Sequence, residues 1–279
     1  MAVVPSSAPK GPMAAYRAKV ASGELKADPM QRLSAEKLEL LSRALRGYSP
    51  QRGERKGLLG RIGFRPKKRD EDDRPPPSGL YLFGGVGRGK SMLMDLFSEN
   101  VDVEHTLRIH HHVFMKRVHD RLHHYRSTNK SKKVDVIDLV ADEIAAEAWL
   151  LCFDEFDVND IADAMIIARL FEALFDRGVV VVATSNKAPD QLYKNGLHRD
   201  RFLPFIDILK ARVDILEMDS GYDYRRDRDR DEEVYFSPLG PEAVSALDHV
   251  FKRLTGENFG PPSYLRIYGR SIAVPQSIK

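Results

Sequence analysis

The pattern of apolar and polar residues predicts strands that alternate with helices from residue 79 onward. Apolar runs typical of buried strands occupy the segments 80–85, 106–115, 149–156, 179–186 and 213–219. Between them, apolar residues at three- and four-residue spacing predict helices at 91–101, 116–127, 136–148, 160–178 and, for the most part, 189–212. This alternation is typical of an α/β fold with a parallel sheet that is covered by helices on both faces.

Helical spacing also occurs on both sides of this region. Residues 14–49 predict an N-terminal helical element, with Ser34 placed as an N-cap within it. Near the other end, the pattern predicts a helix at 241–257 and two short strands around Gly269. The segment 222–233 mixes acidic and basic residues, which predicts a solvated loop.

A change in composition separates the N-terminal helices from the α/β region. Between residues 51 and 69 there are eight Lys/Arg residues and one acid, and an acidic, proline-rich stretch follows. Such a segment cannot build a core, so we interpret it as an exposed connector. We therefore expect four parts, which are a helical element at 1–50, a basic and proline-rich connector at 51–78, an α/β core at 79–219 and a small C-terminal subdomain at 220–279.

Composition narrows the class of protein. Of the 279 residues, 42% are hydrophobic and 30% are charged, so a sizeable core can form. The one cysteine, Cys152, lies in a predicted strand and excludes a disulfide framework. No apolar run approaches the roughly 20 residues of a membrane-spanning helix, and residues 1–20 lack the apolar stretch of a signal peptide. We expect a cytoplasmic protein without integral membrane contact, with the mitochondrial matrix as the alternative location.

A glycine-rich segment between a predicted strand and a predicted helix matches the phosphate-binding motif G-x-x-x-x-G-K-[ST]. In such a loop, glycines let backbone N–H groups point at phosphates, and the helix N-terminus adds positive potential. We expect Lys90 to bridge the β- and γ-phosphates and Ser91 to ligate Mg²⁺. The predicted nucleotide-binding residues are Gly84, Gly85, Val86, Gly87, Arg88, Gly89, Lys90, Ser91 and Met92. The alternative is a glycine-rich turn that matches by accident.

Two acids follow the buried run Leu150–Phe153. Because a buried strand ends where they begin, Asp154 is expected at the phosphate end of the sheet, where it can hold the magnesium shell. Glu155 is then placed to polarise the attacking water as a general base. The alternative is that the two acids cap the next helix.

Polar and basic residues further along provide more candidates. The run 179–183 ends in Thr184-Ser185-Asn186, and Asn186 could contact the γ-phosphate and sense hydrolysis, unless it is an ordinary turn residue. Arg199 and Arg201 follow one helix later. Such arginines often stabilise transition-state charge in a neighbouring subunit, and the alternative is that they are surface residues without a catalytic role.

Six histidines raise the alternative of a metal site. They are His110, His111, His112, His119, His123 and His124. His119 and His123 are four residues apart and would share a helix face. However, no cysteine or carboxylate completes a ligand set convincingly, so we expect solvated or core histidines.

Longer stretches around these motifs are similar to one known family. They are SGLYLFGGVGRGKSMLMDLF, RIHHHVFMKRVHDRLH, LLCFDEFDVNDIADAMIIARLFEALFDRGVVVVATSN, APDQLYKNGLHRDRFLPFI, PEAVSALDHVFKRLTG and YGRSIAVP. The chain resembles the ZapE family of bacterial cell-division ATPases, which is related to the Afg-like ATPases of mitochondria. The resemblance covers nearly all of residues 14–279.

The resemblance implies an AAA+ ATPase core that binds ATP and Mg²⁺ and assembles into a homo-oligomeric ring. The residues to which it assigns roles are Lys90 and Ser91 (Walker A), Asp154 and Glu155 (Walker B), Asn186 (sensor 1) and Arg201 (arginine finger). In bacteria the family is tied to constriction of the division ring through contact with the tubulin-like ring protein. Mitochondrial relatives are tied to turnover of respiratory-chain subunits.

The sequence departs from the family pattern in two places. Asp157 and Asn159 stand where the family more often has Gln and Thr. Family members also continue well past the GRSIAVP region, whereas this chain ends at Lys279. We therefore expect an incomplete C-terminal lid, which puts full activity and stable ring assembly in question.

The favoured hypothesis is Mg²⁺-dependent ATP hydrolysis that remodels a protein partner at the division site. A P-loop GTPase is one alternative, but its N-K-x-D motif is not matched, because Asp190 arrives one residue late after Asn186-Lys187. A nucleic-acid-loading ATPase or a non-hydrolysing adaptor is the other, with the basic run 51–69 as its docking surface. The net charge of +3 and the single aromatic in that run argue against nucleic acid without excluding it.

Overall fold

The chain divides into two units, Met1–Tyr224 and Arg225–Lys279. The computed structural model describes residues 11–50, 75–128, 134–219, 238, 240–256, 262–267 and 269–274. Most of the predicted connector and the mixed-charge loop lie outside these residues. The boundaries of the four predicted parts therefore stay a prediction.

The described part of the first unit contains a five-stranded parallel sheet with the order β2-β3-β4-β1-β5. Its strands are β1 (Gly79–Phe83), β2 (Thr106–His110), β3 (Leu150–Asp154), β4 (Val180–Ser185) and β5 (Val213–Glu217). Every residue of β3 and β4 is buried, because these central strands are covered on both faces. The predicted α/β fold is confirmed.

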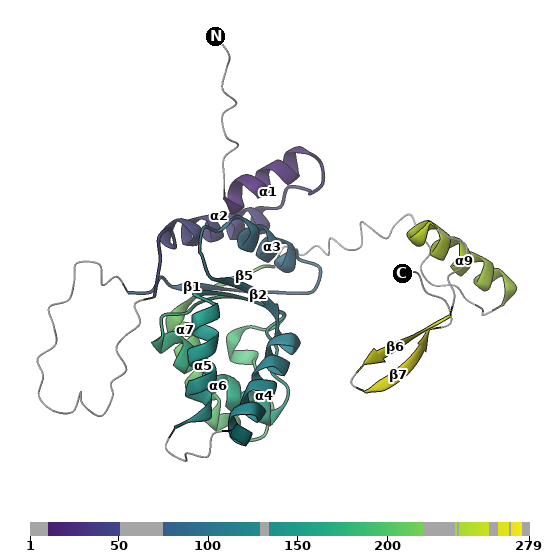
Figure 1. The fold of residues 1–279 in the computed structure, drawn as a ribbon. Coiled ribbons are helices and arrows are strands. Elements are labelled where there is room, and N and C mark those ends of the chain that lie inside the picture. The colour runs from purple at the N-terminus through teal and green to yellow at the C-terminus, as the bar shows by residue number, and fades with distance from the viewer. Residues whose placement is uncertain are drawn as a thin grey trace, which may run out of the picture. The chain divides into compact units, whose positions relative to one another are not determined.

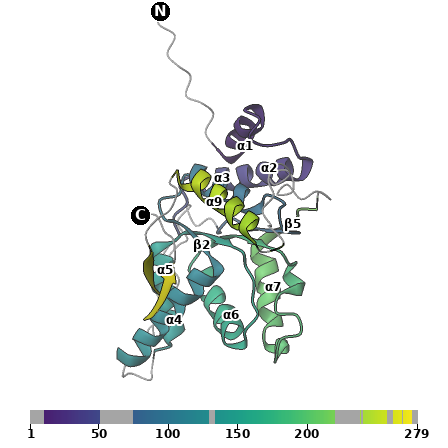
Figure 2. The same cartoon turned by 90° about the vertical axis from the view of Figure 1, so that its right-hand side faces the viewer.

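Helices form a layer on each face of the sheet, as Figures 1 and 2 show from two directions. One layer contains α1 (Pro12–Ala21), α2 (Pro29–Ala44) and α3 (Lys90–Asn100). The other contains α4 (His111–Thr128), α5 (Val136–Glu147), α6 (Ile161–Asp176) and α7 (Leu203–Arg212). Each layer of helices forms a hydrophobic core with one face of the sheet, and alternate strand residues enter alternate cores. Leu80 and Leu82 pack in the first core, with α1, α2 and α3, and Tyr81 packs in the second core, on the opposite face.

The N-terminal helices share the first core with the sheet, and α2 begins earlier than predicted. Asp28 is its N-cap, and the Asp28 carboxylate accepts a hydrogen bond from the Gln31 N–H at 2.7 Å, with Pro29 in the first turn. The prediction of Ser34 as an N-cap is wrong. Ser34 is buried within the helix, and its hydroxyl donates to the Met30 carbonyl at 2.8 Å.

Two segments differ from the predicted elements. The strand predicted at 106–115 ends at His110, because α4 starts at the next residue and turns its apolar side inward at helical spacing. The segment before α7 is mostly irregular and contains the short 3₁₀ helices η2 (Pro189–Gln191) and η3 (Arg199–Arg201). Positive φ angles interrupt a helix there at Tyr193, Asn195 and His198.

The second unit contains a helix and a hairpin, as predicted. Helix α9 (Pro241–Thr255) ends at Gly256, which adopts the left-handed conformation with φ 77°. Strands β6 (Ser263–Ile267) and β7 (Arg270–Val274) pair antiparallel around Gly269. No helix within the described ranges has the length and apolarity needed to cross a lipid bilayer.

Candidate nucleotide site

The candidate site lies where the parallel strands end. Parallel pairing places the last residues of neighbouring strands side by side: His110 of β2 pairs with Asp154 of β3, and Phe83 of β1 pairs with Ser185 of β4. The glycine-rich loop 84–89 leaves β1 at the same edge and leads into α3. The carboxyl edge of an open α/β sheet is where such folds bind ligands.

Close approach of other segments requires glycine at both ends of this loop. Gly84 has φ 151°, and a Cβ there would lie 2.5 Å from the Met218 carbonyl oxygen. Gly89 has φ 85°, and a Cβ there would lie 2.8 Å from Gln31 Nε2. The Gln31 amide also donates to the Arg88 carbonyl at 3.2 Å, so α2 contacts the loop directly.

The predicted loop residues differ in exposure. Gly85 and Val86 are exposed at the loop tip. Arg88 is about one-sixth exposed, at 17% of its side chain, and its guanidinium lies 3.8 Å from Asp219. Met92 is half-buried in the first turn of α3, beside Gly89. The loop thus presents exposed backbone at its tip and is held at its base.

Lys90 joins the loop to the end of β4. Its ammonium donates to the Gly84 carbonyl at 2.8 Å, the Gly85 carbonyl at 2.7 Å and Asn186 Oδ1 at 2.9 Å. The side chain is largely buried, whereas Asn186 is exposed at the strand tip. The structure therefore brings together Lys90 and Asn186, which lie 96 residues apart in the chain.

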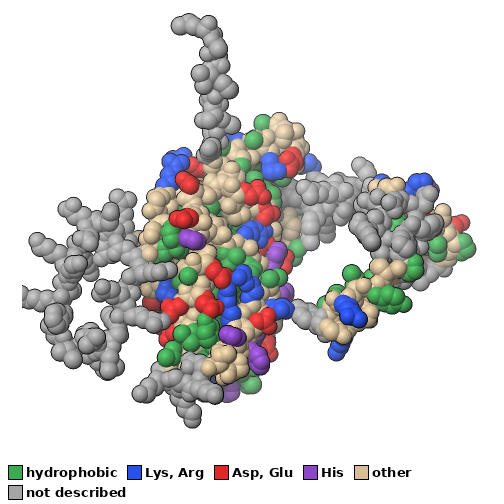
Figure 3. Space-filling model, in the orientation of Figure 1, with side chains coloured by type: hydrophobic (Ala, Val, Ile, Leu, Met, Phe, Trp, Pro, Cys, Tyr) green, Lys and Arg blue, Asp and Glu red, His purple; other side chains and the backbone are tan. Residues whose placement is uncertain are grey.

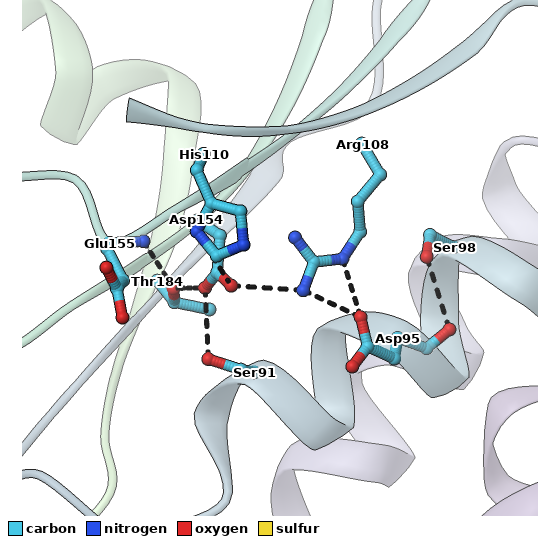
Figure 4. A network of polar contacts seen from close by, with 8 residues as sticks. All are labelled: Ser91, Asp95, Ser98, Arg108, His110, Asp154, Glu155 and Thr184. Atoms are coloured by element: carbon cyan, nitrogen blue, oxygen red, sulfur yellow. Dashed lines mark hydrogen bonds and ion pairs between the residues drawn. The ribbon is translucent and has the colours of Figure 1, made fainter. Parts of the chain in front are cut away.

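Asp154 is completely buried at the centre of a polar network (Figure 4). Its Oδ1 accepts hydrogen bonds from the Thr184 hydroxyl and, at 3.3 Å, from the Ser91 hydroxyl. Its Oδ2 accepts from the Arg108 guanidinium at 3.0 Å, and His110 Nδ1 lies 3.7 Å from the same oxygen. The predicted pair, Ser91 and Asp154, is in contact.

The partners of Asp154 keep it ionised. Burial alone would raise the pKa of Asp154, but the hydrogen bond from Thr184 and the positive charge of Arg108 outweigh it. The pKa of Asp154 is consequently lowered from its ordinary value. The carboxylate is therefore anionic at neutral pH.

Glu155 follows directly and has a different environment. Its side chain is exposed, and its φ angle of 56° lies in the left-handed region, which is uncommon for a residue with a Cβ. Its N–H donates to the Thr184 hydroxyl at 3.0 Å. Thr184 thus contacts both acids, through Asp154 Oδ1 and the Glu155 N–H. In Figure 4 the Glu155 carboxylate lies on the side of Thr184 away from Arg108.

The two residues that depart from the family pattern form a separate contact. Asp157 pairs with Lys187 at 2.6 Å, and the Asn159 amide donates to Asp157 at 3.0 Å. Burial would raise the pKa of Asp157, but the hydrogen bond from Lys187 reverses this, so the pKa is lowered. The contact joins the loops that follow β3 and β4.

Arg199 and Arg201 lie in η3. The Arg199 guanidinium donates to the Asp190 carbonyl at 2.6 Å, whereas Arg201 is exposed. Among the described residues, no hydrogen bond joins Arg201 to the glycine-rich loop. Its role as an arginine finger stays a prediction.

The histidines and the cysteine take structural positions. His111 is buried, and its ring centroid lies 5.6 Å from that of Phe153 and 6.0 Å from that of Phe156. His119 Nε2 lies 2.7 Å from Asp163 on the neighbouring helix. Cys152 is fully buried, and burial raises the pKa of its thiol to about 12. Within the described ranges, no group of three or more His, Cys, Asp or Glu residues is placed to hold a metal ion.

Sequence reasoning missed Arg108 of this network, and with it Asp95, the other acid that Arg108 contacts. His110 entered only as part of a histidine cluster. The signal was the strand pairing, because Arg108 and His110 share a face of β2 and lie opposite Cys152 and Asp154 of β3. That register is set by contacts between distant segments, and the motif spacing alone does not show it.

The donor set fits a magnesium-bound triphosphate. Mg²⁺ takes oxygen ligands and is usually bound through one or two carboxylates together with substrate phosphates. Here a hydroxyl and an ionised carboxylate lie side by side, next to a glycine loop that precedes a helix N-terminus and to a buried ammonium.

Comparison with known families agrees with this geometry. The family model of the AFG1-like ATPase matches residues 10–278. The chain belongs to the AFG1-like ATPase family. It is therefore an ATPase with the P-loop AAA+ fold, and the predicted family resemblance is confirmed.

Individual relatives of this AFG1-like ATPase come from bacteria and eukaryotes. The chain is 39% identical over 262 residues to "Cell division protein ZapE" of Escherichia coli strain K12, covering 94% of this chain and 68% of that protein. It is 37% identical over 300 residues to "Lactation elevated protein 1 homolog B" of Danio rerio, covering 94% of this chain and 60% of that protein. A solved structure of DnaI aligns with a TM-score of 0.45 at 15% identity, covering 73% of this chain and 89% of that chain.

Proposed function

We propose that this AFG1-like ATPase hydrolyses ATP with Mg²⁺ at the carboxyl edge of the sheet and uses the energy to remodel a protein partner. One observation carries the proposal. Consecutive residues at the start of α3, Lys90 and Ser91, contact Asn186 and Asp154 at the ends of two adjacent strands. A bound triphosphate would therefore meet the binding, metal-holding and sensing groups in one place.

Each group has a proposed role in the reaction. The glycine loop and Lys90 bind the phosphates, and Ser91 and Asp154 hold Mg²⁺, which neutralises charge on the phosphates. Glu155 accepts a proton from the attacking water, because it is exposed next to the metal-holding acid. Asn186 contacts the γ-phosphate from the end of β4. In an assembled ring, Arg201 stabilises transition-state charge in the adjacent subunit.

The partner and the process are inferred from relatives. The Escherichia coli relative bears the name of a cell-division protein and shares 39% identity with this chain. This name supports a role in bacterial cell division. As the client we propose the tubulin-like division-ring protein, and as the active form a homo-oligomeric ring. A cytoplasmic location belongs to the same proposal.

The GTPase alternative is disfavoured by the position of Asp190. A guanine-reading acid has to leave both carboxylate oxygens available for guanine N–H donors. In this structure Asp190 lies in η2 and pairs with Lys210 at 2.5 Å. Competition of ATP against GTP for binding distinguishes the two, and a preference for GTP would overturn the choice of ATP.

The site assignment is tested with Lys90→Ala and Glu155→Gln in the full chain. Steady-state ATP hydrolysis with Mg²⁺ should fall about 100-fold or more in each, on the scale of losing a transition-state contact. Glu155→Gln should still bind a fluorescent ATP analogue, whereas Lys90→Ala should bind it weakly. Glu172→Gln, which changes an exposed glutamate on α6, is the matched control. Parental turnover in both site variants would disprove the assignment, and binding without turnover in the parent would favour the adaptor hypothesis.

A further inference from the structure

Besides Lys90, the site contains a second cationic side chain, Arg108, to which the proposed reaction assigns no role. Arg108 extends from β2, and a single guanidinium nitrogen lies 3.0 Å from Asp154 Oδ2 and 2.6 Å from Asp95 Oδ1. Its Nε also donates to Asp95 Oδ1 at 2.7 Å. Figure 4 shows Arg108 between the two acids. One arginine thus bridges two carboxylates that come from different elements.

The two carboxylate oxygens of Asp154 have different partners. Ser91 and Asp95 are four residues apart on α3, so they face the same way. Asp154 Oδ1 points to the Ser91 and Thr184 hydroxyls, while Asp154 Oδ2 points to Arg108 and His110. Arg108 therefore contacts one oxygen of the same carboxylate whose other oxygen faces the Ser91 hydroxyl.

Arg108 sets the charge of this pair of acids. Asp95 and Asp154 without a cation would form a doubly negative site at the sheet edge, and oxygen-rich sites of that charge attract divalent ions. The guanidinium remains protonated in proteins at all ordinary pH values, so its positive charge is permanent. Through the low-dielectric surroundings of a fully buried carboxylate, this charge repels a second cation strongly.

We propose that Arg108 prevents a divalent ion from binding at Asp154 before the nucleotide arrives, so that the metal enters only together with the triphosphate. The phosphates then add the negative charge that offsets Arg108. Arg108 acts through Asp154 and is not itself a catalytic residue. This inference rests on the proposed function, in which Asp154 holds the metal.

The test measures Mn²⁺ binding to the full chain without nucleotide, by electron paramagnetic resonance of the free ion. Arg108→Gln should bind Mn²⁺ at least about tenfold more tightly than the parent, because it removes a unit charge next to a buried acid. Arg108→Lys keeps the charge and should bind Mn²⁺ as weakly as the parent. The double variant Arg108→Gln/Asp95→Asn should lose most of the gain, since it also removes one negative charge.

Arg121→Gln is the matched control, because Arg121 also bridges two carboxylates and is equally exposed, at 20% against 22% for Arg108. It should bind Mn²⁺ like the parent. Unchanged binding in Arg108→Gln, or an equal gain in Arg108→Lys, would overturn the proposal. Circular dichroism checks that each variant folds, and Arg108→Met replaces Arg108→Gln if the latter does not.

A separate measurement isolates the proposed function. Asp154→Asn should abolish Mg²⁺-dependent ATP turnover. Parental turnover in Asp154→Asn would mean that the metal role of Asp154 is wrong, and the Arg108 proposal would fail with it. Loss of turnover in Asp154→Asn, together with no Mn²⁺ gain in Arg108→Gln, would remove the Arg108 proposal alone.

Discussion

Two polar networks in the first unit are built alike and differ in burial. In one, Arg108 bridges Asp95 and Asp154; in the other, Arg121 contacts Glu143 at 3.1 Å and also pairs with Glu147. The side chains of Glu143 and Glu147 are both 42% exposed, whereas Asp154 is 0% exposed. In the first network the bridge therefore joins a buried acid, Asp154, to the exposed Asp95, whereas in the second it joins two surface acids.

The difference shows which polar contacts organise a site. An exposed ion pair contributes little to stability, typically about 0–1 kcal/mol, because water and salt screen it. A buried carboxylate must have all its lone pairs satisfied, so each partner of Asp154 is needed. The surface network joins two neighbouring helices, α4 and α5, whereas the site network draws on β2, β3, β4 and α3. The site network can form only after the sheet and α3 have packed together.

This contrast extends to the molecular surface. Figure 3 shows acidic and basic side chains interspersed over the visible face of the first unit. Interspersed charges screen one another and give no continuous basic stripe on that face, which agrees with the small net charge of +3. On this face of the described residues, charge of one sign is therefore not concentrated in one place.

Among changes that separate the two networks, breaking the buried one at Thr184 should have the largest effect. Thr184→Val keeps the shape of a side chain that is 1% exposed, but it removes the donor to Asp154 and the acceptor for the Glu155 N–H. We expect ATP turnover to fall about tenfold or more and the free energy of unfolding to fall by about 1–3 kcal/mol. Steady-state hydrolysis and urea denaturation measure the two effects.

The matched change in the surface network is Tyr125→Phe, which removes a hydroxyl that donates to Glu143. It should leave turnover unchanged and alter stability by less than about 1 kcal/mol. Thr184→Ser, which retains the hydroxyl, should restore most of the turnover lost in Thr184→Val. Equal effects of Thr184→Val and Tyr125→Phe would contradict the role assigned to burial.

A change of pH should sharpen the contrast at His111, a buried residue that follows His110 and packs against Phe153 and Phe156. Burial, and then the nearby His112, lowers the pKa of His111 from 6.5 to about 4. Between about pH 4 and 6.5, the imidazole of His111 is therefore neutral in the folded protein and protonated in the unfolded chain. The free energy of unfolding is therefore highest above about pH 6.5. It falls by up to about 3 kcal/mol as the pH decreases toward 4.

Urea denaturation at pH 7, 5.5 and 4 measures this loss. His111→Gln should show a smaller decrease in unfolding free energy over that range than the parent does. His123→Gln, which changes an exposed histidine on α4, should keep the parental pH dependence. If His111→Gln loses as much stability on acidification as the parent, another group is responsible.

The smallest effect is expected from Arg121→Gln. Since both of its acidic partners are substantially exposed, removal of the charge should change the free energy of unfolding by no more than about 1 kcal/mol. The difference should shrink further in high salt. Thermal denaturation at two salt concentrations measures it, and a loss of several kcal/mol would show that the surface network is also structural.

The central strands and the phosphate loop could be predicted because their determinants are local. The buried run at Leu150–Phe153 and the glycines between 84 and 89 each specify their own backbone. Strand pairing is not local, so Arg108 could not be assigned to Asp154 before the register of β2 and β3 was known. The alternation of strands and helices predicted a parallel sheet, but it did not give the order of the strands.

The errors at element ends also have physical causes. The apolar periodicity predicts a helix that begins at Ser34, but the start of α2 is set by Asp28 as N-cap and by the proline that follows it. Helix α4 follows β2 directly, without turn residues between them. The residue types around His111 therefore do not show where the strand ends and the helix begins. The left-handed residues before α7 include Tyr193, a bulky residue type in which a positive φ is uncommon.

The contact between α2 and the glycine loop has a mechanical consequence. Because Gln31 is buried and its amide holds the Arg88 carbonyl, while the absence of a side chain at Gly89 makes room for Gln31, the loop has little freedom to slide past the helix. A displacement of the loop away from α2 would have to break this hydrogen bond, so the loop and the N-terminal helices are mechanically coupled at this contact.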